Sequence, residues 1–225
     1  MFTASNKGGL GRAGFSLVEL LAVVGIIGIM AVAGLPALKG ITGSTGRTGA
    51  INGLMSALDQ ARSAAILSGT NAYVAFPDQT GFGGLPATAS FNPSNYIYRS
   101  YAIFRDPNPD LQETGLTQIG KWQSLPPGLA LLSTNITALP QANLSFSLPG
   151  SATNNTVSLR VIAFSSGGGL LNPGATSGVT VYEGYWNGSQ GVPARANRIV
   201  DRITLNRFTG RAFLSIATNT NTGSY

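Results

Sequence analysis

The chain of 225 residues contains no cysteine and no histidine, and only 10% of its residues are charged. Without cysteine it forms no disulfide, and without histidine it lacks the commonest general base and a common metal ligand. Asp106 and Asp110 flank prolines and are interpreted as a solvated turn rather than as an acid/base pair. We therefore expect no enzyme activity, no catalytic residue, no cofactor and no metal site.

Negatively charged residues are also scarce: Asp and Glu together number eight, against 14 Lys and Arg. Glycine numbers 30, which is typical of a secreted β-rich protein with many turns. The excess of positive charge is greatest near the C-terminus. It predicts either a surface for an anionic partner or arginines scattered over the solvent faces of strands, and we favour the second. These arginines are Arg195, Arg198, Arg202, Arg207 and Arg211.

One long apolar run lies near the N-terminus. Residues 20–35 contain no polar side chain, and Glu19 is the only ionisable residue in 17–38. A helix of this length is sufficient to cross a hydrocarbon core about 30 Å thick. Lys7 and Arg12 precede the run, so we expect the N-terminus to stay in the cytoplasm.

Glu19 is costly at the start of a membrane helix unless a cation pairs with it. Cleavage between Gly14 and Phe15 would create an α-ammonium group one helical turn before Glu19. That amine has the right sign to pair with Glu19, on the same subunit or on a neighbour.

The order of these features resembles the type IV prepilin signal of pilins and of the pseudopilins of type II secretion: a basic leader, Gly14-Phe15, Glu19 and an apolar helix. The resemblance implies that a prepilin peptidase cleaves after Gly14 and N-methylates Phe15. It also implies that Glu19 registers each subunit in a helical fibre, and that Pro36 is a helix-weakening proline that breaks the helix. The implied partners are the peptidase, other pilins or pseudopilins, membrane lipid and an inner-membrane assembly platform with its ATPase.

Three other interpretations of the run remain open. An ordinary membrane anchor would need neither Glu19 nor the Gly-Phe junction. A secretory signal peptide would use residues 31–33, Ala-Val-Ala, as its cleavage site before Gly34, although the run is longer than a usual signal and contains a charge. A buried core helix is the third.

Two segments follow the run. Residues 40–49 carry Gly at every third position, and we predict a weak joint there, where packing into a fibre stretches or unwinds the chain.

Residues 51–69 have apolar residues at helical spacing and end at Gly69, which predicts a helix packed on a sheet. Residues 54–76 resemble the H-type minor pseudopilins and their pilus counterparts, whose heads pack two antiparallel sheets near the long helix. The helical stripe consists of Ile51, Leu54, Met55, Leu58, Ala61 and Ala65.

From residue 71 onward, short strands separated by turns predict antiparallel sheets rather than βαβ units. The expected fold class is α+β and pilin-like, with a leader at 1–14, a membrane and fibre-core helix at 15–39, the joint and head helix at 40–70 and a β head at 71–225. We expect a single-pass protein of the bacterial inner membrane with its head in the periplasm, later part of the fibre. The expected strands are 72–76, 96–104, 121–125, 144–148, 157–164, 179–185, 199–205 and 212–216.

Nucleic acid is the alternative partner, as for pilus proteins of the H-type that bind DNA during uptake. Gly210-Arg211-Ala212 matches the first half of a Gly-Arg-x-Arg signature, but Phe213 stands in place of the second arginine. Arg207 and Arg211 share parity and would lie on one face of a strand. Hydrogen bonding across a hairpin is the alternative role for these arginines.

Overall fold

The computed structural model describes residues 17–88, 91–111, 115–147, 154–171, 178–194 and 198–219. Within them, the side chains of residues 28–45, 111, 154, 198, 199 and 216–219 lie outside the description. The chain divides into two compact units, Met1–Ser44 and Thr45–Tyr225, and each is described by itself. The second unit contains all of the sheets.

Helix α1, Leu17–Ser68, is continuous through Pro36 and through the glycine-rich residues 40–49. The helix break expected at Pro36 is therefore absent from α1, and the weak joint predicted at 40–49 lies within a helical segment and stays a prediction. An interior proline removes one backbone hydrogen bond, whereas a break would require a second, costly nucleation of the helix beyond it. The boundary between the two units, at Ser44 and Thr45, nevertheless falls inside the glycine-rich stretch.

The expected leader, residues 1–14, lies outside the described residues, as do Phe15 and the side chains of the second half of the apolar run. In the part of the chain that is described, no helix has the length and apolarity that crossing a membrane requires.

The second half of α1 confirms the predicted apolar stripe. Leu54, Leu58, Ala61 and Ala65 are each 0% exposed and belong to the main core. Gly69 follows the helix with φ of 67°, a left-handed conformation that glycine adopts without steric cost.

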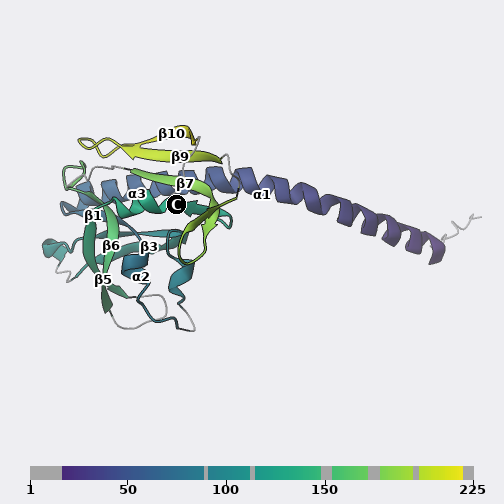
Figure 1. Cartoon of the computed structure of the whole chain (residues 1–225), viewed down its shortest axis with the longest axis horizontal. Coiled ribbons are helices and arrows are strands. Elements are labelled where there is room, and N and C mark those ends of the chain that lie inside the picture. The colour runs from purple at the N-terminus through teal and green to yellow at the C-terminus, as the bar shows by residue number, and fades with distance from the viewer. Residues whose placement is uncertain are drawn as a thin grey trace, which may run out of the picture. The chain divides into compact units, whose positions relative to one another are not determined.

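The first sheet has the strand order β3-β2-β1-β6-β5, and every pairing in it is antiparallel (Figure 1). Its central strand β1 coincides with the predicted strand at 72–76. The bounds are β1 Ala72–Phe76, β2 Ser100–Arg105, β3 Thr117–Ser124, β5 Gln141–Ser147 and β6 Asn154–Phe164.

The second sheet has the order β10-β9-β7-β4, also antiparallel, and β8 pairs with β7. Strands β9 and β10 form a C-terminal hairpin at the top of Figure 1. The antiparallel two-sheet head predicted from the sequence is confirmed. The bounds are β4 Leu129–Leu131, β7 Gly178–Trp186, β8 Gly191–Pro193, β9 Arg198–Leu205 and β10 Ala212–Asn219.

Some elements differ in their bounds from the predicted ones, and several short helices were not predicted. The strand predicted at 96–104 begins only at Ser100, because Tyr98 takes a positive φ of 53° within a turn. Residues 217–219, expected in a loose tail, extend β10. The remaining short elements are α2 Gln79–Phe82, η1 Pro93–Asn95, η2 Pro109–Leu111 and α3 Ser133–Thr137.

One core joins the helix to both sheets. It contains Leu58 of α1, Phe104 and Leu159 of the first sheet, and Val181 and Ile203 of the second. Burying an apolar side chain of this size stabilises a fold by about 1.5–3 kcal/mol. The head is therefore held by apolar contacts that extend from α1 across two sheets.

Candidate functional site: the N-terminal helix and the arginine hairpin

The first candidate region is the start of α1. Gly14 and Phe15, the expected cleavage junction, lie outside the described residues. Glu19 lies in the first turn of the helix, where the helix dipole favours a negative charge. The apolar side chains around it are open to solvent: Leu17 is 77% exposed and Leu21 is 68% exposed.

The second region is the β9–β10 hairpin, to which the C-terminal arginines were assigned. Arg195 lies outside the described residues, and only the backbone of Arg198 is described, in β9. Arg202 is exposed on β9, opposite Ser215 of β10. Arg207 and Arg211 lie in the connecting turn rather than on one strand. The parity argument for a common strand face is therefore wrong, because β9 ends at Leu205 and β10 begins at Ala212.

Local hydrogen bonds build this turn. The Asn206 side-chain oxygen accepts from the backbone N–H groups of Phe208 and Thr209, each at 3.0 Å. The Gly210 N–H donates to the Asn206 carbonyl at 2.8 Å, and Gly210 adopts φ of 65°. The Arg207 guanidinium lies over the Phe208 ring, 4.5 Å from its centroid. This arrangement leaves the arginines at the solvent side of the turn.

Arg62 of α1 holds the hairpin turn. Its Nε–H is shared between the Thr209 carbonyl, at 2.6 Å, and the Gly168 carbonyl, at 3.2 Å. Gly210 packs against the same Gly168 carbonyl so closely that a Cβ would clash with it. The helix therefore fixes both turns at this end of the head.

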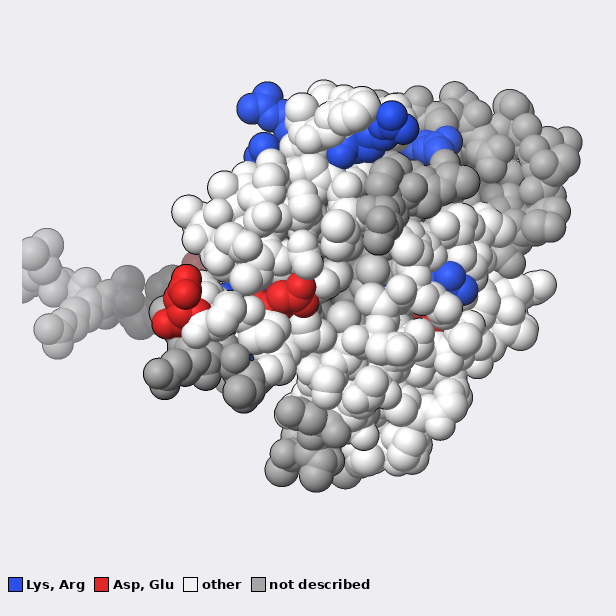
Figure 2. All heavy atoms as spheres, turned by 90° about the vertical axis from the view of Figure 1, so that its left-hand side faces the viewer, with Lys and Arg blue, Asp and Glu red and all other residues white. Residues whose placement is uncertain are grey.

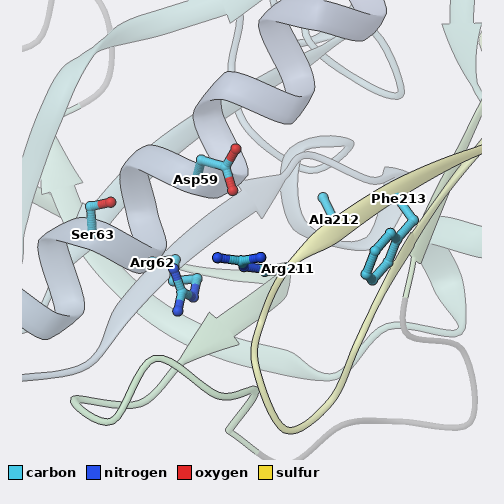
Figure 3. Close-up of a pocket in the computed structure, with 6 residues that line it drawn as sticks. All are labelled: Asp59, Arg62, Ser63, Arg211, Ala212 and Phe213. Carbon is cyan, nitrogen blue, oxygen red and sulfur yellow. The ribbon is translucent and has the colours of Figure 1, made fainter.

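A hollow of about 430 Å³ lies between the helix and the hairpin (Figure 3). The Arg211 guanidinium points toward α1, where Asp59 and Arg62 lie, and the exposed Phe213 ring lies beyond Ala212. The residues lining this hollow are Asp59, Arg62, Ser63, Arg211, Ala212 and Phe213.

Arg47 forms a second charged contact between α1 and the second sheet. Its Nε–H donates to the carboxylate of Asp201 on β9, which is only 3% exposed, and its Nη1 lies 3.7 Å from Glu183 on β7. The hydrogen bond to Asp201 raises the pKa of Arg47, partly opposed by burial. The guanidinium therefore stays charged at neutral pH.

The sequence interpretation missed Arg47 and Arg62 as contacts. A signal for Arg47 was present, because it is the only ionisable residue within 40–49. Arg62 lies off the apolar stripe, which predicts an exposed side chain. The periodicity of the helix does not predict which turn of the head this side chain contacts.

Two further acids of the head are also bonded. Asp78 is 0% exposed; its carboxylate accepts from Arg160 Nε at 3.0 Å and from the Gly81 N–H at 2.8 Å. Asp106, expected in a solvated turn, instead accepts from Tyr73 Oη at 3.0 Å. Burial and then this hydrogen bond raise the pKa of Tyr73 to about 12.

Residues 50–192 match the family of type II transport protein GspH. The match covers more than half of the chain. The chain belongs to this family. The GspH assignment confirms the resemblance to pilin-like minor pseudopilins. The matched region stops within β8, so the β9–β10 hairpin and Arg47 lie outside it. No curated protein and no solved structure matches the chain.

Proposed function

We propose that this GspH-family protein is a minor pseudopilin, a non-enzymatic structural subunit of a type II secretion pseudopilus or type IV pilus. Cleavage after Gly14 and N-methylation of Phe15 prepare the subunit, which inserts in the inner membrane with its head in the periplasm. Its partners are the prepilin peptidase, sister pseudopilins and the assembly platform.

The observation that carries this proposal is the apolar first part of α1. Leu17, Leu21 and Ile27 are each more than 60% exposed, around a single carboxylate, Glu19. Such a helix surface is unfavourable in water and is stabilised by lipid or by other helices. In a fibre, the amine of a mature Phe15 would neutralise Glu19.

The processing step is tested by the intact mass of the mature protein from producing cells. A chain beginning at Phe15 with one added methyl group supports the proposal. A chain beginning at Gly34 indicates an ordinary signal peptide and contradicts it.

The assembly role is tested by Glu19→Ala, followed by the fraction of subunits recovered in sheared fibres. We expect at least a tenfold loss of incorporation at unchanged cellular level, because the helix loses its registering charge. Asp110→Ala, which removes an acid from η2 in the head, is the matched control. Equal incorporation of Glu19→Ala and the native chain would contradict this role.

A second candidate function is DNA binding. Its supporting observation is the set of exposed arginines on the hairpin, Arg202, Arg207 and Arg211. Figure 2 shows basic side chains gathered at the level where β9 and β10 lie in Figure 1. Phosphate contacts predict an affinity for duplex DNA that falls steeply with salt. Absence of binding at low salt would exclude this candidate.

A further inference from the structure

Strand β10 forms an edge of the second sheet in the part of the chain that the structure describes. It closes the second sheet and pairs only with β9 among the described strands. Its eight residues, Ala-Phe-Leu-Ser-Ile-Ala-Thr-Asn, include no charge, no proline and no glycine. Natural edge strands usually carry lysine, proline or a bulge that prevents pairing with another chain. By these criteria, β10 is suited to accept a further strand.

The backbone of β10 supports the same conclusion. The Asn206 N–H donates to the Arg211 carbonyl at 2.9 Å, so residues 206 and 211 direct these groups toward each other next to the turn. Hydrogen-bonded and non-hydrogen-bonded pairs alternate in an antiparallel ladder. From the observed register, Ala212, Leu214 and Ile216 stand in non-hydrogen-bonded pairs with residues of β9. Their backbone N–H and C=O groups therefore point away from β9.

Both faces of the edge carry exposed apolar side chains. Phe213, which shares a face with Thr204, is 56% exposed, and Leu214, opposite the buried Ile203, is 43% exposed. A strand added beyond β10 would place its own side chains beside both and would remove apolar area from water.

Charge restricts the partner. Arg211 stands at the start of β10, and Arg202 lies across the small Ser215, over which its long side chain can extend toward an added strand. Asp201, the acid of β9, is buried and paired with Arg47. Two copies pairing β10 to β10 would bring these arginines together, which is unfavourable. A strand that carries carboxylates avoids this cost.

We propose that the β10 edge binds an extended, carboxylate-bearing segment of another subunit by β-strand addition, with Arg202 and Arg211 contacting the carboxylates. That this subunit is a sister pseudopilin rests on the proposed function. The strand addition itself does not, because it requires neither processing at Gly14 nor Glu19.

The test uses the full chain in detergent micelles and a ten-residue probe peptide of alternating valine and threonine with two glutamates. Amide exchange is measured by NMR. In the free protein we expect fast exchange at 212, 214 and 216 and slow exchange at 213 and 215. The peptide should slow exchange at least tenfold at 212, 214 and 216 only. Slow exchange at these amides in the free protein, or no change with peptide, would overturn the proposal.

Two variants test the backbone and the charge separately. Leu214→Pro removes one outward N–H and should weaken peptide binding at least tenfold, whereas Leu214→Thr, which keeps it, should bind within about threefold. Arg202→Glu with Arg211→Glu should reverse the preference toward a matched peptide with lysines in place of the glutamates. Lys121→Glu, on the edge of the first sheet, is the control and should leave the preference unchanged.

The same measurements distinguish the carboxylate-bearing segment from other partners that could bind the β10 edge. Duplex DNA that slows exchange at 212, 214 and 216 when the peptide does not would overturn the proposal in favour of nucleic acid. Slowing that increases with protein concentration alone would overturn it in favour of self-pairing. A failure of Glu19→Ala to reduce fibre incorporation would remove the proposed function and leave the peptide result unaffected.

Discussion

Charged side chains in the head are few, and the buried ones are paired. Asp78 and Asp201 are nearly inaccessible to water, and each contacts one arginine, Arg160 and Arg47 respectively. A buried ion pair contributes little net stability compared with apolar residues, but removing one partner leaves an uncompensated charge. The two arginines are therefore needed mainly because the two aspartates are buried.

Replacing Arg47 should reveal this dependence. We expect Arg47→Met to lower the free energy of unfolding by about 3–5 kcal/mol, because the buried Asp201 carboxylate would lose its partner. Urea unfolding of the full chain in detergent measures the change. Glu183→Gln is the control, and since Glu183 is partly exposed its loss should cost under about 1 kcal/mol. Equal effects of the two substitutions would contradict this account.

Tyr73 should make stability depend on pH in alkaline solution. Its pKa is raised to about 12 in the fold, so the folded chain holds the phenolic proton more tightly than the unfolded chain, whose tyrosine pKa is about 10. The stabilisation is complete below about pH 10 and is lost as the pH rises toward 12. Urea unfolding at a series of pH values measures this loss.

Tyr73→Phe should flatten that decline and should cost about 1 kcal/mol at neutral pH through the lost hydrogen bond to Asp106. Tyr185→Phe removes a hydroxyl from a ring that is 53% exposed and serves as the control. An unchanged alkaline slope in Tyr73→Phe would show that Tyr73 does not cause the decline.

At the scale of elements, the β9–β10 hairpin depends on close approach between two turns. The Arg62 contact and the Gly210 backbone bring the turn after β9 against Gly168. A side chain at Gly210 would oppose this approach and would also strain a backbone with positive φ.

We expect Gly210→Ala to destabilise the hairpin by more than the roughly 1–2 kcal/mol of a left-handed non-glycine residue alone. Gly115→Ala is the matched control, because Gly115 has φ of 78° but a Cβ there meets nothing within 4 Å. Amide exchange at 202, 204 and 213, whose N–H groups face the partner strand of the hairpin, reports on the hairpin. If both substitutions have the same effect, the close contact between Gly210 and Gly168 contributes nothing to hairpin stability beyond the cost of the positive φ.

The elements predicted well from the sequence are those with a long periodic signal. The stripe of Leu54, Leu58 and Ala61 predicted the buried helix face, and alternation predicted β1 and most of β6. Elements of three to five residues, such as β4 and α3, are too short for periodicity to define. The Arg47–Asp201 and Arg62–Thr209 contacts join residues far apart in the chain, so only the fold brings them together.

At the scale of the whole molecule, the glycine-rich stretch coincides with the boundary between the two units. Although the stretch is helical, its glycines lower the cost of local opening by about 1 kcal/mol each relative to alanine. The joint therefore remains a prediction about stability rather than about secondary structure.

Hydrogen exchange on the membrane-embedded protein tests this prediction. Residues 40–46 should exchange at least tenfold faster than residues 51–68, whose apolar stripe is buried. Replacing Gly40 and Gly43 by alanine should slow exchange in the first segment and leave the second unchanged. Protection in the native chain that is equal across both segments would contradict the joint.

The Arg47–Asp201 pair spans 154 positions of the chain. During synthesis, Arg47 at the base of the head helix is made first, and the carboxylate of Asp201 follows 154 residues later. A nascent or C-terminally shortened chain that stops before β9 therefore cannot close this end of the head. The charge of Arg47 is therefore matched by Asp201 only after β9 has been synthesised and has joined the second sheet.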